Sequence, residues 1–150
     1  MKYAHNIKIT VFAKPEENIL EIKTKLSTLI PFNIEEQKTP LIINTVEGFE
    51  NRKISILEID LFKEAHTNAF LKSLNEHLTK DQKELLLSQR WSRLDEELYF
   101  YIRLDKNSLI NNSEYAITDS GDCFHIRIHL AAFPKTTENA LKVVEKIFEQ

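Results

Sequence analysis

The side chains best suited to chemistry lie on two stretches in which polar and apolar residues alternate strictly. One follows turn residues at 119–122 and reads CFHIRIHL over residues 123–130. Because strand side chains point alternately to opposite faces, alternate residues share a face and lie about 6.6 Å apart. One face would then be apolar, and the other would carry a thiol and three nitrogen-bearing side chains: Cys123, His125, Arg127 and His129.

The second stretch, residues 98–104, alternates in the same way and carries two tyrosines and an arginine on its polar face. Unpaired RNA is held by bases stacked on aromatic rings or guanidinium planes and by cations that contact phosphates. If the two strands are neighbours, they supply both kinds of group. We therefore predict an RNA-binding face made of Tyr99, Tyr101, Arg103, His125, Arg127 and His129. The alternative is that helices or a partner subunit cover this face.

A third group precedes the second stretch, where a tryptophan lies close to two arginines. An aromatic ring flanked by guanidinium groups suits both base stacking and phosphate contacts, so Arg90 and Arg93 join the predicted RNA-binding residues. In the alternative interpretation, Trp91 fills the edge of the core and the two arginines pair with neighbouring carboxylates.

Metal binding is a weaker interpretation of the first stretch. His125 and His129 are four residues apart, which on a strand separates them by about 13 Å, too far for both imidazoles to reach one metal ion. Further ligands would have to come from Asp122, Cys123 or a distant residue such as His66. We expect no metal and no other cofactor.

Catalytic interpretations are also weak. Cys123 and His125 could form a nucleophile and base pair, but a catalytic thiolate needs a donor-lined pocket and a buried cysteine is usually a small apolar residue. A hydrolase using His125, His129 and Asp122 is a further alternative. Acidic runs normally solvate a loop or pair with arginines, which argues against a hydrolase built from Asp95, Glu96, Glu97 and Asp105. We expect no enzymatic activity.

Composition limits the remaining classes. The chain has 150 residues, the length of one domain, and we expect a single domain over residues 1–150. Its net charge of −3 argues against indiscriminate coating of nucleic acid. Its two glycines exclude the glycine-rich phosphate loops of nucleotide-binding enzymes. The absence of a membrane-length apolar run, of a secretory leader and of a second cysteine favours a cytoplasmic protein with no membrane partner.

Hydrophobic periodicity predicts the elements that position these residues. Strands are expected at 4–14, 41–46, 53–61 and 98–104, with a hairpin formed by 115–118 and 123–130. Helices are expected from Pro15 to Pro31, over 62–78, from a capping box at Thr79 and Gln82 towards Trp91, and after Thr136 and Thr137. Residues 105–113 are predicted to form one short helical turn. Because hairpins dominate, the fold class is α+β, with a mainly antiparallel sheet and helices on one face.

Three segments also resemble a known family. These are His66–Phe70, the pair Ser92–Glu96 and Phe100–Lys106, and the block Asp119–Pro134. They resemble an archaeal family described as RNA-binding proteins and predicted exosome subunits, which is similar in fold to the ribosomal large-subunit protein that binds five-S RNA. The resemblance covers essentially the whole chain. It implies an α+β fold, RNA binding and homodimers, and it implies no catalytic residues.

The expected function is therefore that of a non-catalytic RNA-binding accessory in RNA processing. The partners implied are RNA, a second copy of the chain, and components of the exosome or ribosome. A homodimeric scaffold is the alternative, in which the polar strand face is a subunit interface. Because few cations lie on that face, RNA binding is expected to be modest and sensitive to salt.

Overall fold

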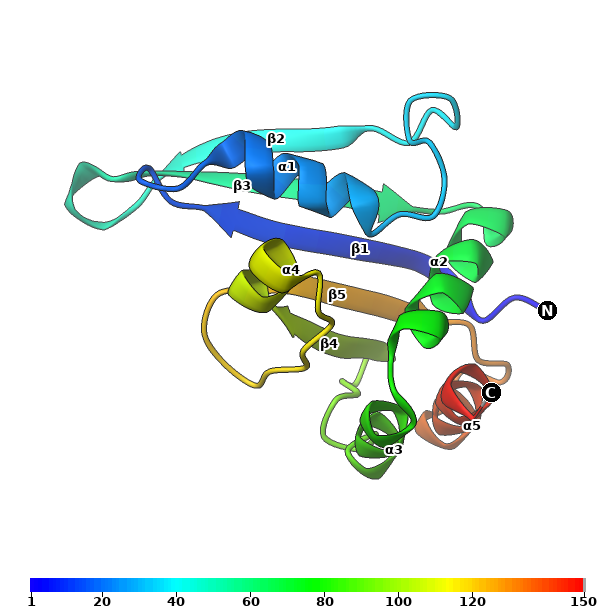
Figure 1. Cartoon of the computed structure of the whole chain (residues 1–150). Coiled ribbons are helices and arrows are strands. Elements are labelled where there is room, and N and C mark those ends of the chain that lie inside the picture. The colour runs from blue at the N-terminus through cyan, green and yellow to red at the C-terminus, as the bar shows by residue number, and fades with distance from the viewer. Residues whose placement is uncertain (150) are drawn as a thin grey trace. The chain divides into compact units, whose positions relative to one another are not determined.

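The computed structural model describes residues 1–149 as a five-stranded sheet with helices between its strands (Figure 1). In chain order the elements are β1 (Ala4–Ala13), α1 (Ile19–Thr28), β2 (Leu41–Glu47), the 3-10 helix η1 (Phe49–Asn51), β3 (Lys53–Leu61), α2 (Glu64–His77), α3 (Lys80–Ser88), β4 (Tyr99–Asp105), α4 (Lys106–Asn112), β5 (Cys123–Leu130) and α5 (Thr137–Phe148). The strands lie in the order β2-β3-β1-β5-β4 in an antiparallel sheet, which confirms the predicted α+β class. A bilayer span would need a longer and more apolar helix than any found in residues 1–149.

The chain divides into two compact units. Unit 1 comprises residues 1–7, 61–102 and those from 127 onward, and unit 2 comprises residues 8–60 and 103–126. Strands β1, β3, β4 and β5 therefore contribute residues to both units, β3 only through Leu61. The expectation of a single domain stays a prediction.

In unit 1, α5 packs against α3 and α2 (Figure 1). The Asn75 side chain of α2 donates a hydrogen bond to the Ile147 carbonyl oxygen of α5 at 2.6 Å. Thr136 caps α5 by accepting from the Asn139 amide at 3.2 Å. The apolar spacing of this helix predicts an inward-facing side, and all residues of that side are buried, which confirms the prediction: Ala140, Val143, Val144, Ile147 and Phe148.

The buried face of α2 differs from the predicted one. Ala65 is exposed, whereas His66 and Thr67 are buried along with Phe70 and Leu74. The apolar spacing of this segment predicts that Ala65 lies on the same side as Phe70 and Leu74 and that His66 lies elsewhere, and this prediction is wrong. The large side chains fix the rotation of the helix, because burying an alanine methyl contributes much less free energy than burying phenylalanine or leucine.

In unit 2, α1 and α4 lie side by side (Figure 1). Helix α1 begins later than the proline signal predicted, because the Asn18 side chain caps it by accepting from the Leu20 and Glu21 amides. Glu17, predicted to lie in the first turn, instead accepts hydrogen bonds from the Lys14 amide and from the Lys106 ammonium.

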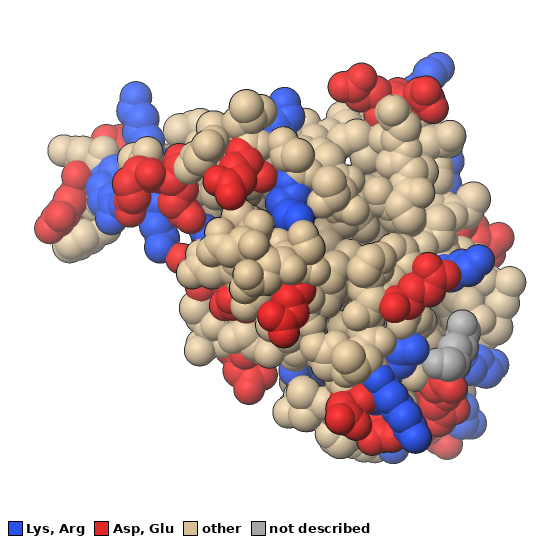
Figure 2. All heavy atoms as spheres, viewed as in Figure 1, with Lys and Arg blue, Asp and Glu red and all other residues tan. Residues whose placement is uncertain are grey.

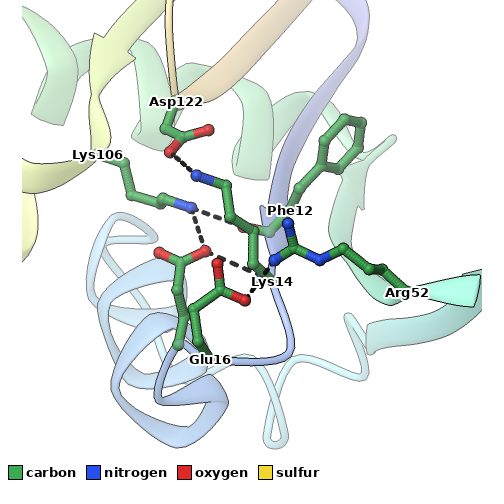
Figure 3. A network of polar contacts seen from close by, with 7 residues as sticks. Phe12, Lys14, Glu16, Arg52, Lys106 and Asp122 are labelled. Carbon is green, nitrogen blue, oxygen red and sulfur yellow. Dashed lines mark hydrogen bonds and ion pairs between the residues drawn. The ribbon is translucent and has the colours of Figure 1, made fainter. Parts of the chain in front are cut away.

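A buried lysine ties α4 to β1. Lys106 is 1% exposed, and its Nζ donates to the Phe12 carbonyl oxygen at 3.0 Å and to the Glu17 carboxylate at 2.9 Å (Figure 3). Because a buried charge is tolerated only when it is paired and hydrogen-bonded, these contacts explain how an ammonium group can lie inside unit 2.

The predicted hairpin before β5 is wrong. Residues 115–118 contact the end of β4 instead, through an isolated bridge between Ile117 and Leu104 and a hydrogen bond from the Thr118 amide to the Arg103 carbonyl oxygen. The neighbours of β5 in the sheet are β1 and β4. The apolar row of β5 pairs better within a sheet of several strands than in an isolated ribbon, because only the former buries it.

Candidate nucleic-acid interface

In unit 1, aromatic side chains from three neighbouring strands form a continuous row. The rings of His129 on β5 and Tyr99 on β4 are stacked, with centroids 4.3 Å apart and planes 21° apart. His5 on β1 meets His129 edge-on, with centroids 5.0 Å apart. Phe133, which follows β5, meets His5 edge-on at 5.9 Å. These four residues, which we call the aromatic row, are in the contact geometries that aromatic pairs favour.

The aromatic row is open to solvent. The Phe133 side chain is 79% exposed, and the other three residues are partly exposed. Helices of the same chain therefore do not enclose it. The intervening residues of β4 and β5 in unit 1, such as Phe100 and Ile128, are completely buried, so the apolar side of these strands anchors the row.

A guanidinium group lies on the aromatic row. Arg127 Cζ is 4.5 Å from the centroid of the Tyr99 ring, a cation–π contact. Arg127 Nε is buried and has no hydrogen-bond partner among the described residues. The Tyr99 ring and the charge of the Asp95 carboxylate both act on this guanidinium group.

Positive charges surround the two histidines of the row. Burial lowers the pKa of both imidazoles below the ordinary value. The charges of Lys2 and Lys135 lower the pKa of His5 further. His5, Lys135 and Arg127 do the same for His129. The Asp95 carboxylate opposes this effect at His129 but does not outweigh it, so at neutral pH both histidines are neutral hydrogen-bonding groups.

Asp95 organises the turn that leads into β4. Its carboxylate accepts from the Glu97 and Tyr99 amides at 3.0 and 2.9 Å and from the Tyr101 hydroxyl at 2.7 Å. Burial favours the neutral carboxyl, but these donors and the Arg127 charge outweigh it and lower the pKa of Asp95. Burial and the bond to Asp95 raise the pKa of Tyr101 to about 12. Asp95 thus has a structural role in positioning Tyr99.

The residues around Trp91 are divided between solvent and interior. The interpretation that Trp91 fills the core edge is wrong, because its side chain is 65% exposed. Arg93 is 8% exposed and donates to the Gln89 side chain and to the Tyr101 carbonyl oxygen. Arg90 is partly exposed. Its Nη1 donates to the Leu87 carbonyl oxygen, and its Nε is 3.7 Å from the Glu145 carboxylate.

The remaining predicted site residues belong to unit 2. Arg103 on β4 and His125 on β5 are both partly exposed. The six predicted strand residues are thus divided, with Tyr99, Tyr101, Arg127 and His129 in unit 1. Their role in RNA binding stays a prediction.

The metal and thiol alternatives find little support. Within residues 1–149 no group of three or more His, Cys, Asp or Glu residues is arranged to hold a metal ion. Burial raises the pKa of the Cys123 thiol, so the thiol is mainly protonated at neutral pH and is a poor nucleophile. Asp105, one of the acidic candidates, caps α4 by accepting from the amide and hydroxyl of Ser108.

Sequence reasoning missed four residues beside the site: Lys2, His5, Phe133 and Lys135. His5 was missed because alternation from Ile7 would place it on the apolar face, whereas the burial pattern shifts by one residue between Ala4 and Ile7. An exposed aromatic residue directly after a strand was the available signal for Phe133.

The helical side of unit 1 has a different charge pattern. Over α3 and α5, basic and acidic side chains lie next to one another (Figure 2). An interspersed pattern of this kind attracts a polyanion less than a cluster of one sign, so these two helices are poorer candidates for RNA contact than the aromatic row.

Comparison with known proteins identifies the family and the fold of the chain. A family model described as RNA binding matches residues 6–131. An RNA-binding protein of Pyrococcus abyssi is 28% identical over 146 residues, which cover 97% of this chain and 94% of that protein. Solved structures from Archaeoglobus fulgidus and Methanothermobacter thermautotrophicus have the same fold. The first has a TM-score of 0.84 at 24% identity and covers 96% of this chain and 99% of that one. The second has a TM-score of 0.77 at 22% identity and covers 97% and 98%. The chain thus belongs to the RNA-binding family.

Proposed function

We propose that unit 1 binds unpaired RNA on the aromatic row together with Arg127. The observation that carries this proposal is the row itself, which brings rings from three strands together beside one guanidinium group. Bases of any sequence can stack on such rings, because every base has a π-face. We therefore expect the contacts made by the row itself to show little sequence preference.

Each part of the site has a distinct task in this proposal. The exposed Phe133 ring stacks one base, and Lys2, Lys135 and Arg127 neutralise phosphates. Because the Tyr99 ring already contacts both His129 and Arg127, little side-chain entropy is lost when RNA binds. The other predicted site residues are proposed to contribute less to RNA affinity, namely Arg103, His125, Arg90 and Arg93. The donors of Arg93 already have partners within the chain.

The proposed role is that of a non-catalytic accessory in RNA processing, associated with the exosome or the ribosome. The family resemblance implies this role and no catalytic residues. The protonated thiol of Cys123 agrees with it. The protein would hold an unpaired segment of RNA and leave it intact.

A titration tests RNA binding by the row. Phe133→Leu removes the ring but keeps an apolar side chain, and Phe49→Leu is a matched control because Phe49 is 87% exposed in unit 2. Labelled single-stranded and duplex RNA of equal length are titrated with each protein. Phe133→Leu should weaken single-strand binding by roughly 5- to 150-fold, the range for one stacked base. Equal affinity of both variants and wild type would refute the proposal.

We also propose that the chain forms a homodimer through the edge strand β2. Three of its apolar side chains are exposed, Ile42 (46%), Ile43 (41%) and Val46 (44%). Residues 41–46 contain no proline or charge, the usual protections of an open sheet edge. In antiparallel pairing centred on Asn44, Ile42 would lie opposite Val46 of the partner subunit. This contact differs from the scaffold alternative, in which the polar strand face is the subunit interface.

Sedimentation equilibrium tests the dimer. We expect a wild-type dimer and a monomeric Ile42→Lys/Val46→Lys variant, because four lysines would then face one another across the pairing. Leu20→Lys/Leu85→Lys is the control, since both leucines are exposed outside β2. A monomeric wild-type protein at tens of micromolar, or a dimeric β2 variant, would exclude this interface.

A further inference from the structure

Unit 2 contains a pocket that the aromatic row does not use. Its volume is about 350 Å³, and its walls include Thr10 and Phe12 on β1, Cys123 and His125 on β5, and Asp122 just before β5. This volume is near the lower end of small-molecule sites, which span about 300–1,000 Å³. The pocket therefore suits a single ring system better than a dinucleotide.

We propose that this pocket binds one unpaired nucleobase of the RNA, with guanine preferred. The proposal rests on the function proposed above and adds a base-reading site to it. Two features carry it, an exposed aromatic ring at the pocket and a carboxylate with a free oxygen.

The ring is that of Phe12. Its side chain is 55% exposed although the residue lies within β1 between two buried residues, Val11 and Ala13. A base entering the pocket would cover this ring, which is the stacking contact that unpaired RNA makes on sheet surfaces. The mainly apolar remainder of the wall, including the Cys123 side chain, suits the faces of a base.

The carboxylate is that of Asp122. Its Oδ2 accepts from the Lys14 ammonium at 2.6 Å (Figure 3), and its Oδ1 has no partner among the described residues. The hydrogen bond from Lys14 lowers the pKa of Asp122, so the group is ionised and can only accept. Lys14 thereby fixes one oxygen and leaves the other for a ligand.

Guanine matches this acceptor best among the four bases. Its Watson–Crick edge carries the N1–H and N2–H donors side by side, whereas uracil, cytosine and adenine each offer a donor next to an acceptor. A carboxylate faces repulsion from an adjacent acceptor but not from an adjacent donor. A specific base contact of two hydrogen bonds typically changes affinity by roughly 5- to 150-fold.

Cys123 allows a test that does not depend on the aromatic row. It is the only cysteine in the sequence, and it lines the pocket. The rate of its reaction with a small thiol reagent is measured on the full chain at increasing GMP, AMP, CMP or UMP. GMP should slow the reaction at concentrations roughly 5- to 150-fold lower than UMP.

Variants separate the two parts of the pocket and the two sites. Phe12→Leu should weaken protection by all four nucleotides, and Asp122→Asn should remove the preference for GMP. Phe133→Leu should leave protection by GMP unchanged while weakening RNA binding. Absence of protection by any nucleotide at millimolar concentration, or GMP protection unaltered in both pocket variants, would overturn this site and leave RNA binding by the row standing. Equal protection by all four nucleotides would overturn the preference for guanine.

Discussion

The position of Arg127 illustrates how single residues define the proposed interface. Its charge lies on the Tyr99 ring, and that ring in turn stacks on His129. The three side chains come from two strands, so their positions depend on the strand register rather than on a loop. Arg127 is consequently the residue whose loss should affect RNA binding without disturbing the core.

We predict that Arg127→Ala weakens binding of single-stranded RNA more than Arg52→Ala does. Both variants lose one arginine that is at least partly exposed. Arg52 serves as the control because it belongs to unit 2, where it forms an ion pair with Glu16. The expected loss for Arg127→Ala is about 1–2 kcal/mol, from one desolvated cation–π and phosphate contact. Fluorescence anisotropy at fixed salt measures it. Arg127→Lys should recover only part of the RNA affinity lost in Arg127→Ala, because an ammonium group lacks the planar stacking surface of a guanidinium group. Identical losses for Arg127→Ala and Arg52→Ala would contradict this role.

Tyr101 should titrate later than an ordinary tyrosine. Its folded pKa of about 12 lies above the ordinary value of 10.0, so folding keeps its proton. The associated stability is present below pH 10 and is lost as the pH rises from 10 towards 12. Ultraviolet titration should show one tyrosine that ionises at higher pH than the others, and Tyr101→Phe should remove this component. The same variant should also lower the unfolding free energy by about 1–3 kcal/mol, because the Asp95 carboxylate loses a hydrogen-bond donor. An unchanged titration curve in the variant would show that Tyr101 is not perturbed.

At the scale of elements, side-chain caps decide where helices begin. The sequence offered two threonines before α5, and the structure uses Thr136, whose oxygen accepts from the Asn139 amide. Thr137 is the first residue of α5 and also exposed, so it provides a control one residue away.

We predict that Thr136→Ala destabilises the chain by about 1 kcal/mol, the usual cost of losing such a cap. Thr137→Ala should change stability little or raise it slightly, because alanine is the better helix former. Urea denaturation of both variants measures the difference. A larger loss for Thr137→Ala would show that the cap has been assigned to the wrong residue.

Most elements could be predicted because their signals are local. The alternation of β5, the capping box of α3 and the apolar periodicity of α5 each depend on residues close in sequence, and each is confirmed. The hairpin at residues 115–118 failed because strand pairing is decided by competition among partners distant in sequence. The shift of His5 to the open face and the approach of Lys2 and Lys135 could not be predicted for the same reason.

For the whole molecule, a net charge of −3 means that attraction to RNA must be local. Three cations lie near the aromatic row, namely Lys2, Arg127 and Lys135, as the effects of their charges on His5 and His129 indicate. Few cations imply few released counterions.

The salt sensitivity of RNA binding that the sequence predicts should therefore be present but shallow. Three neutralised phosphates predict a slope of about −2 for log Kobs against log salt on single strands. Lys2→Gln/Lys135→Gln should reduce the slope to about −1. RNA affinities of both proteins at salt concentrations from about 50 to 300 mM give the two slopes. A slope steeper than about −4 would require a much larger basic surface than the one described.

Stability should fall on mild acidification. The pKa values of His5, His66 and His129 are lowered in the folded chain, mainly by burial. The unfolded chain then binds more protons around pH 6, so the unfolding free energy decreases as the pH falls from 7.5 to 5.5. Denaturation at both pH values measures this, and His66→Gln should reduce the dependence. Greater stability at pH 5.5 would mean that the histidines are stabilised in their charged form.

Cross-linking is the most direct test of where RNA is bound. A single-stranded RNA containing a photoreactive uridine is irradiated with the full chain, and the modified peptides are located by mass spectrometry. The account predicts cross-links on residues of the aromatic row and their neighbours, above all Phe133, His129 and Tyr99. Cross-links confined to α3 and α5, or to the β2–β3 hairpin, would contradict it.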